Sequence, residues 1–142
     1  METIVVGIDD SPNARRALRW AIDHAAAEDK LVAVHVWQLP VAGGFDSAFL
    51  DPAVFEEGAR KTADAIITEV LAEAEAHPQR VEARVVQGHA SGVLIEAGGQ
   101  GDLLVLGSRG RGGFVGLVLG SVTSAVVNHA PCPVVVVPAT DD

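Results

Sequence analysis

Apolar runs and amphipathic stretches take turns along the chain. Short runs rich in valine, leucine and isoleucine are typical of strands buried on both faces. They lie at residues 3–8, 31–37, 81–86, 103–106 and 134–137. Between them, apolar residues recur at helical spacing over about 12–26, 52–76, 91–97 and 121–129. This alternation predicts an α/β fold with three layers, in which an open five-stranded parallel sheet has helices on both faces.

Several helix boundaries carry local signals. Ser11-Pro12 and Asp51-Pro52 each place a capping side chain before a proline that suits the first helical position. Ser91 is predicted to cap the third helix, and Gly98-Gly99 to end it. Residues 38–50 show no period and contain proline and glycine, which predicts a long loop of the kind that often serves in binding.

Composition and charge narrow the class of protein. The 142 residues fit one domain, 1–142, that is large enough to fold without disulfides or metals. The single cysteine, Cys132, suits a reducing compartment. A formal net charge of −9 repels nucleic acid and anionic membranes, and only 4% of the residues are aromatic. We therefore expect no nucleic-acid partner.

A glycine-rich segment follows the fourth apolar run. Gly107, Gly110, Gly120 and Ser121 form the pattern G-x2-G-x9-G-S, which runs from the end of a predicted strand to the start of a predicted helix. Glycines let an anion approach backbone N–H groups, and a helix N-terminus adds unpaired donors and a positive dipole end. No lysine follows Lys61, so the segment is not a standard P-loop. The pattern favours a phosphate cradle.

The same segment has the G-x-x-x-G spacing seen in membrane helices. Arg111 precedes this stretch, and polar residues from Ser121 onward interrupt its apolar run. A membrane helix needs about 20 apolar residues, so we expect no membrane span.

At this point the chain resembles the universal stress protein family. The resemblance covers essentially the whole chain and rests on "IVVGIDDS", "LVAVHV", "GDLLVLGSRGRGGFVGLVLGSVTSAVV" and "PCPVVVV". It implies the strand order 3-2-1-4-5, with the switch point between the first and fourth strands. It also implies the family's ATP-binding branch, homodimers and a cytoplasmic role in stress survival. Asp10 departs from the family, where many members have glycine.

Candidate site residues lie around the predicted switch point, where parallel sheets bind ligands. Asp9 is suited to accept from ribose hydroxyls or to bind a metal-associated water, or it only forms a turn. Arg109 and Arg111 either clamp phosphates or are solvated loop charges. The resemblance implies that Val36 touches adenine, although it also fits a plain core position. The remaining candidates, assigned by the motif or the resemblance, are Gly7, Ile8, Leu106, Gly107, Ser108, Gly110, Gly120, Ser121 and Val122.

These observations favour an ATP-binding regulator or sensor with Mg²⁺ on the triphosphate. The sequence shows no nucleophile–base pair and assigns no metal ligands, so we expect no dedicated enzyme. Three alternatives stay open: AMP or cyclic AMP in the same pocket, an interaction module without nucleotide, and a slow ATPase. The apolar run Val134–Val137 is expected at a sheet edge, which predicts a homodimer that pairs along it.

Overall fold

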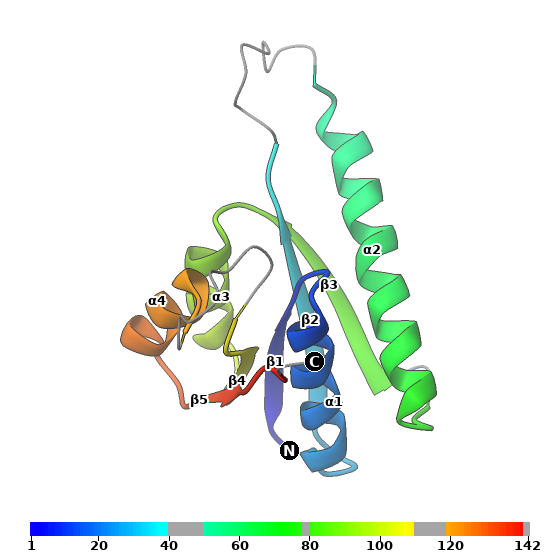
Figure 1. Ribbon diagram of the computed structural model, residues 1–142, viewed down its shortest axis with the longest axis vertical. Coiled ribbons are helices and arrows are strands. Elements are labelled where there is room, and N and C mark those ends of the chain that lie inside the picture. Colours follow the sequence, from blue (N-terminus) through cyan, green and yellow to red (C-terminus); the bar gives the residue numbers. More distant parts are fainter. Residues whose placement is uncertain (40–49, 78–79, 110–118, 141–142) are drawn as a thin grey trace.

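The computed structural model describes residues 1–39, 50–77, 80–109 and 119–140 (Figure 1). Strands and helices alternate along the chain as the apolar pattern predicted. In order, the elements are β1 (Thr3–Ile8), α1 (Pro12–His24), β2 (Lys30–Trp37), α2 (Pro52–Glu73), β3 (Val81–Gln87), α3 (Ala90–Gly98), β4 (Leu103–Gly107), α4 (Ser121–His129) and β5 (Val134–Val137).

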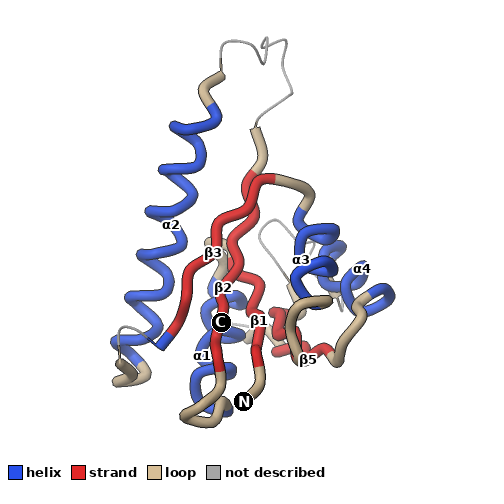
Figure 2. Tube along the Cα trace, turned by 180° about the vertical axis from the view of Figure 1, so that it is seen from behind, coloured by secondary structure: helices blue, strands red, loops and turns tan. Residues whose placement is uncertain are grey.

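All five strands belong to one parallel sheet of order β3-β2-β1-β4-β5, which confirms the predicted fold class and strand order. In Figure 2 the strands lie side by side, with the helices flanking them. The register pairs Ile8 at the end of β1 with His35 of β2. Strand β2 runs further, and its last residue Trp37 pairs with Gln87 of β3. At the carboxyl edge, β2 therefore extends past the end of β1.

Two apolar clusters fill the spaces between the three layers. On one face, α1 and α2 pack on alternate strand residues such as Val6, and their own Leu18 and Ile66 are almost completely buried. On the other face, α3 and α4 pack on the intervening residues, including the fully buried Leu104. Full burial of such a side chain contributes about 1.5–3 kcal/mol, so both faces hold the sheet in place. The strands are added in one direction from β1 to β3 and in the other from β4 to β5, so the switch point lies between β1 and β4.

Two of the predicted helix caps are confirmed and one is wrong. The Oγ of Ser11 accepts a hydrogen bond from the Ala14 N–H at 3.1 Å, and Asp51 accepts from the Ala53 N–H at 3.0 Å. Ser91 lies inside α3, whose cap is His89. The first bond of that helix runs from the Val93 N–H to the His89 carbonyl, at 2.9 Å, so the helix is capped two residues earlier than predicted.

Helix α2 ends at Glu73, earlier than the predicted end near residue 76. Glu75 adopts a left-handed φ of 53°. The Ala76 N–H then donates to the Leu71 carbonyl at 3.0 Å, and the Glu75 N–H donates to Ala72 at 3.2 Å. This is the hydrogen-bond pattern of a Schellman motif, which usually has glycine in the left-handed position. Helix α1 likewise stops at His24, before the predicted end near residue 26.

Among the described residues, no helix is long and apolar enough to cross a membrane.

Candidate functional site

The carboxyl edge of the sheet gathers the predicted site. Strands β1 and β4 are neighbours and end there, at Ile8 and Gly107. The chain then leaves β1 toward α1 on one face and leaves β4 toward α4 on the other (Figure 1). In open parallel sheets ligands bind in a crevice outside the strand ends at such a switch point, which makes this position the candidate crevice here.

The β1 side of this crevice holds Gly7, Ile8 and Asp9. A Cβ on Gly7 would lie 2.5 Å from Cδ2 of Leu106, so the absence of a side chain lets β1 pack closely on β4. The Asp9 Oδ1 accepts a hydrogen bond from the Ser11 N–H at 2.9 Å. This bond is the turn-forming role that the sequence left open for Asp9. A ligand role for its carboxylate stays a prediction.

The end of β2 forms the next wall. Half-buried Val36 belongs to the apolar cluster beneath α3 and α4, as does Leu106. The alternation of the strand turns Trp37 to the opposite face. The indole N–H of Trp37 is shielded from solvent and has no hydrogen-bond acceptor in the described part of the chain.

Hydrogen bonds bring the two ends of the glycine-rich loop together. The Gly120 N–H donates to the Ser108 carbonyl at 2.7 Å. The Thr123 hydroxyl, in the first turn of α4, donates to the Gly107 carbonyl at 2.7 Å. The motif residues at the end of β4 and at the start of α4 are therefore neighbours. Thr123 has no place in the glycine motif, and sequence reasoning missed it.

Asn13 is a second residue that sequence reasoning missed. Its side chain is buried under the start of the loop, where its Oδ1 accepts from the Arg109 N–H at 2.7 Å. A Cβ on Gly107 would lie only 2.6 Å from the Oδ1 of Asn13. Position 107 therefore has no room for a side chain, because the Asn13 side chain lies against it. The sequence analysis had explained this glycine differently, as a residue that lets a phosphate approach the backbone. The signal in the sequence was a polar residue on the inward side of an amphipathic helix.

The N-terminus of α4 holds the last two residues of the glycine motif, Gly120 and Ser121. Gly120 caps this helix, so no side chain accepts from its first turn. Ser121 is exposed and Val122 is half-buried. The first N–H groups of a helix have no partner within the helix, and here they face the switch point with the positive end of the dipole. The N–H groups of Ser108, Arg109 and Gly120 already donate to protein acceptors.

Gly110 and Arg111 lie outside the described residues, as do Gly112, Gly113 and Gly116. In the described part of the chain, no group of three or more histidine, cysteine, aspartate or glutamate side chains could hold a metal ion. Burial raises the pKa of the Cys132 thiol, which favours the neutral form of a small packing residue.

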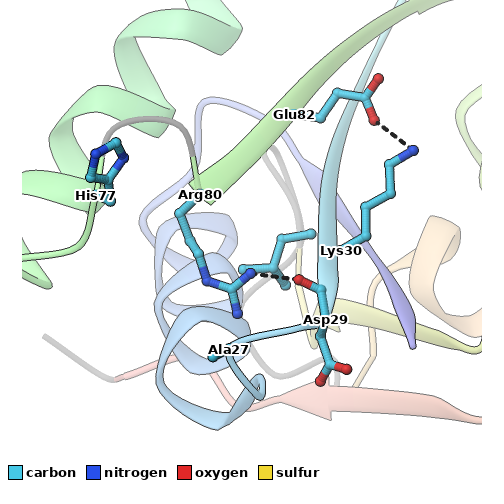
Figure 3. A pocket seen from close by; sticks show the side chains of 7 residues that line it. Ala27, Asp29, Lys30, His77, Arg80 and Glu82 are labelled. Atoms are coloured by element: carbon cyan, nitrogen blue, oxygen red, sulfur yellow. Dashed lines mark hydrogen bonds and ion pairs between the residues drawn. The ribbon is translucent and has the colours of Figure 1, made fainter. Parts of the chain in front are cut away.

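A pocket of about 520 Å³ lies at the other edge of the sheet, at the amino ends of β2 and β3 (Figure 3). Its charged groups bind one another or the backbone. Arg80 donates to the Asp29 and Ala26 carbonyls, at 2.6 Å in both cases, and the Lys30 ammonium lies 3.4 Å from Glu82. These groups stabilise the chain turns at this edge, so we place the candidate site at the carboxyl edge.

Comparison with known proteins agrees with the geometry. Residues 1–138 match the model of the universal stress protein family. A universal stress protein of Mycolicibacterium smegmatis is 38% identical over 139 residues, covering 94% of this chain and 45% of that protein. One from Thermus aquaticus is 35% identical over 141 residues, covering 96% of this chain and 98% of that protein. The chain thus spans about half the length of the mycobacterial relatives that it matches.

A solved structure shares both the fold and part of the sequence. The crystal structure of a universal stress protein in complex with cAMP superposes with a TM-score of 0.69 at 27% identity, covering 96% of each chain. The sheet order and these full-length similarities agree. The chain belongs to the universal stress protein family.

Proposed function

We propose that this chain binds an adenine nucleotide, ATP with Mg²⁺, across the carboxyl ends of β1, β2 and β4, and acts as a nucleotide-dependent regulator in a stress response. The observation that carries the proposal is the pair of hydrogen bonds from Gly120 and Thr123 to Ser108 and Gly107, which sets the end of β4 beside the glycine-capped N-terminus of α4. The solved relative in complex with cAMP supports the adenine nucleotide as the ligand class.

At the phosphate end, the N–H groups of Ser121 and Val122 are the proposed donors. Hydrogen bonds to charged groups contribute roughly 1.5–3 kcal/mol each, and charges beyond about 8 Å are largely screened at physiological salt. A few local donors therefore outweigh the net charge of −9. The guanidinium groups of Arg109 and Arg111 are proposed to clamp the outer phosphates. Mg²⁺ would bind mainly through the phosphates, with Asp9 as the nearest candidate carboxylate.

At the adenosine end, Val36 and Leu106 provide an apolar wall, and Gly7 and Ile8 form the floor. The Asp9 carboxylate is proposed to accept from ribose hydroxyls. The residues around the crevice thus fit a nucleotide at both ends.

The proposed site holds the nucleotide and gives no residue the task of activating water. We therefore expect ATP turnover close to the uncatalysed rate, and a role that depends on occupancy. A true ATPase would show steady turnover far above background that disappears in Asp9→Ala.

Two substitutions at Ser121 test the phosphate end. Ser121→Pro removes one backbone N–H without disturbing the helix, because proline is favoured at the first helical position. Gly120 already has the extended φ of −69° and ψ of 163° that a following proline requires. Isothermal titration with ATP and Mg²⁺ should show affinity falling roughly 10- to 150-fold, the value of one charge-assisted bond. Ser121→Ala is the matched control that removes the hydroxyl alone.

The proposal fails if the wild-type chain shows no heat of binding at millimolar nucleotide. The assignment of the N–H fails if Ser121→Pro and Ser121→Ala have equal affinities.

Cyclic AMP is the second candidate ligand, favoured by the complex of the solved relative. It carries one phosphate and no terminal phosphoryl groups, so its binding should depend little on Mg²⁺. A titration of both nucleotides with and without Mg²⁺ separates the candidates. Tighter binding of cyclic AMP, unchanged by removal of Mg²⁺, would favour it over ATP.

We also propose a homodimer through β5, the edge strand next to β4. The carbonyl of Pro133 accepts from Leu104 of β4, and the carbonyl of Val137 accepts from Ser108, the residue after β4. By alternation, Val134 and Val136 turn their backbone groups to the free edge. An apolar strand with unpaired groups favours pairing with another strand.

A further inference from the structure

Asn13 lies at the meeting point of three elements and has no place in the glycine motif. We propose that Asn13 is a positioning residue that fastens the start of the glycine-rich loop to the end of β5, so that these two segments open as one cooperative unit. The inference rests on the proposed nucleotide function in one respect, because the fastened loop is the one assigned to the phosphates.

The side chain of Asn13 uses both ends of its amide. It is only 5% exposed, and it is the second residue of α1, whose start is fixed by the Ser11 cap. Its Nδ2 donates to the Val137 carbonyl at 3.0 Å. Its Oδ1 accepts from the Arg109 N–H at 2.7 Å and from the Ser108 hydroxyl at 3.4 Å. One side chain therefore joins α1, the loop and β5.

Ser108 completes the junction. Its N–H donates to the Val137 carbonyl at 2.9 Å, and its own carbonyl accepts from the Gly120 N–H at 2.7 Å. Its Oγ accepts from the Ala139 N–H at 3.1 Å. The bond to Gly120 extends the junction to the start of α4, where the phosphate donors are proposed.

These bonds depend on one another. If the loop moved away, the Val137 carbonyl would lose its bond from Ser108, and Asn13 would lose the donors to its Oδ1. A buried polar group left without a partner costs more than the bond itself contributes, so partial opening is unfavourable. Strand β5 lies at the edge of the sheet, so occupancy of the loop would change the stability of a surface strand. If β5 pairs with a second copy, ligand binding and pairing are reciprocally linked.

Native-state amide hydrogen exchange on the full chain, followed by NMR, tests this junction without nucleotide. In the wild-type protein, the N–H groups of Ser108, Arg109, Gly120 and Ala139 should exchange through one shared opening. In Asn13→Ala, Arg109 and Ala139 should exchange roughly tenfold faster, the value of about one lost hydrogen bond. The central amides of β1 and β2 should keep their rates.

Two further variants separate the bonds. Ser108→Ala removes the acceptor of the Ala139 N–H, so Ala139 should leave the shared opening and exchange faster than Arg109. Asn13→Asp keeps the acceptor for the Arg109 N–H and removes the donor to the Val137 carbonyl. This variant replaces Asn13→Ala in the comparison if Asn13→Ala does not fold. Different opening free energies for the loop and for Ala139 in the wild-type chain would overturn the proposal.

The ligand arm uses ATP with Mg²⁺. In the wild-type protein, saturation should slow exchange at Ala139 as well as at Gly120. In Asn13→Ala, ATP should slow amide exchange at Gly120 but not at Ala139. A side chain that only supports the fold would not change which amides respond to ATP. Equal slowing at Ala139 in both proteins would refute the coupling. Absence of ATP binding to the wild-type chain would count against the proposed function alone, because the ligand-free arm is measured independently.

Discussion

Replacing Gly107 by alanine tests the packing at the start of the glycine-rich loop. The added Cβ would lie 2.6 Å from both Cγ and Oδ1 of Asn13, and 3.0 Å from Nδ2. Asn13 is buried and hydrogen-bonded at both ends of its amide, so it is not free to move aside. Overpacking costs about 1–3 kcal/mol, and each strained hydrogen bond adds about 0.5–1.5 kcal/mol. We expect Gly107→Ala to lower the free energy of unfolding by roughly 2–4 kcal/mol.

Urea unfolding followed by circular dichroism, at one fixed protein concentration, gives the measurement. The decisive comparison is a double-mutant cycle. In an Asn13→Ala background the new methyl group has room, so Gly107→Ala should cost less than about 0.5 kcal/mol there. Gly92→Ala in α3 is the control, because its Cβ would meet nothing within 4 Å. It should stabilise the chain by about 0.5–1 kcal/mol. Equal destabilisation by Gly107→Ala in both backgrounds would refute the packing explanation.

Three other predictions concern the edge strand, the nucleoside and acid stability. Val136→Pro removes an N–H from the free edge of β5 and should convert a dimer into a monomer in light scattering, whereas Val136→Thr should not. A wild-type monomer at micromolar concentration would refute the edge pairing. Trp37→Phe removes an indole N–H that is shielded from solvent on the face opposite Val36, so ATP affinity in calorimetry should stay unchanged; weaker binding would place Trp37 in the site. Backbone N–H donors from Glu2 and Ala26 lower the pKa of Asp29. A lowered pKa stabilises the fold above the ordinary carboxyl value of about 3.9 and loses that effect as pH falls through the folded pKa. Asp29→Asn should therefore melt below wild type at pH 7, and the difference should shrink as pH falls below about 3.9; a difference that stays constant would contradict this.

Sequence reasoning reached the fold because the relevant signals are local or periodic. Buried parallel strands appear as short apolar runs, and the caps at Ser11 and Asp51 are read from adjacent residues. Where a boundary depends on backbone conformation alone, the signal is missing. The residues around Glu75 do not indicate a left-handed conformation, because the residue that usually adopts it after a helix end is glycine.

The site was predictable only in part, for a related reason. The glycine pattern and the family resemblance predicted which segments meet at the switch point. They could not predict that Asn13 would bond to Arg109, because the two residues lie 96 positions apart. Thr123 and Gly107 show the same limit over a shorter separation. Contacts of this kind depend on how α1 and α4 pack on the sheet. The hydrophobic pattern of the sequence does not predict that packing.

The central position of β1 has a consequence for synthesis. Strand β1 pairs with β2 early in the chain, but its second neighbour β4 begins only at Leu103. The two partners are also joined at their starts, where the Thr3 N–H donates to Asp102 at 2.8 Å across 99 positions. The ribosome delivers the N-terminal residues first. The innermost strand of the finished sheet is therefore an open, apolar edge for most of translation, when the nascent chain is most exposed to wrong pairing.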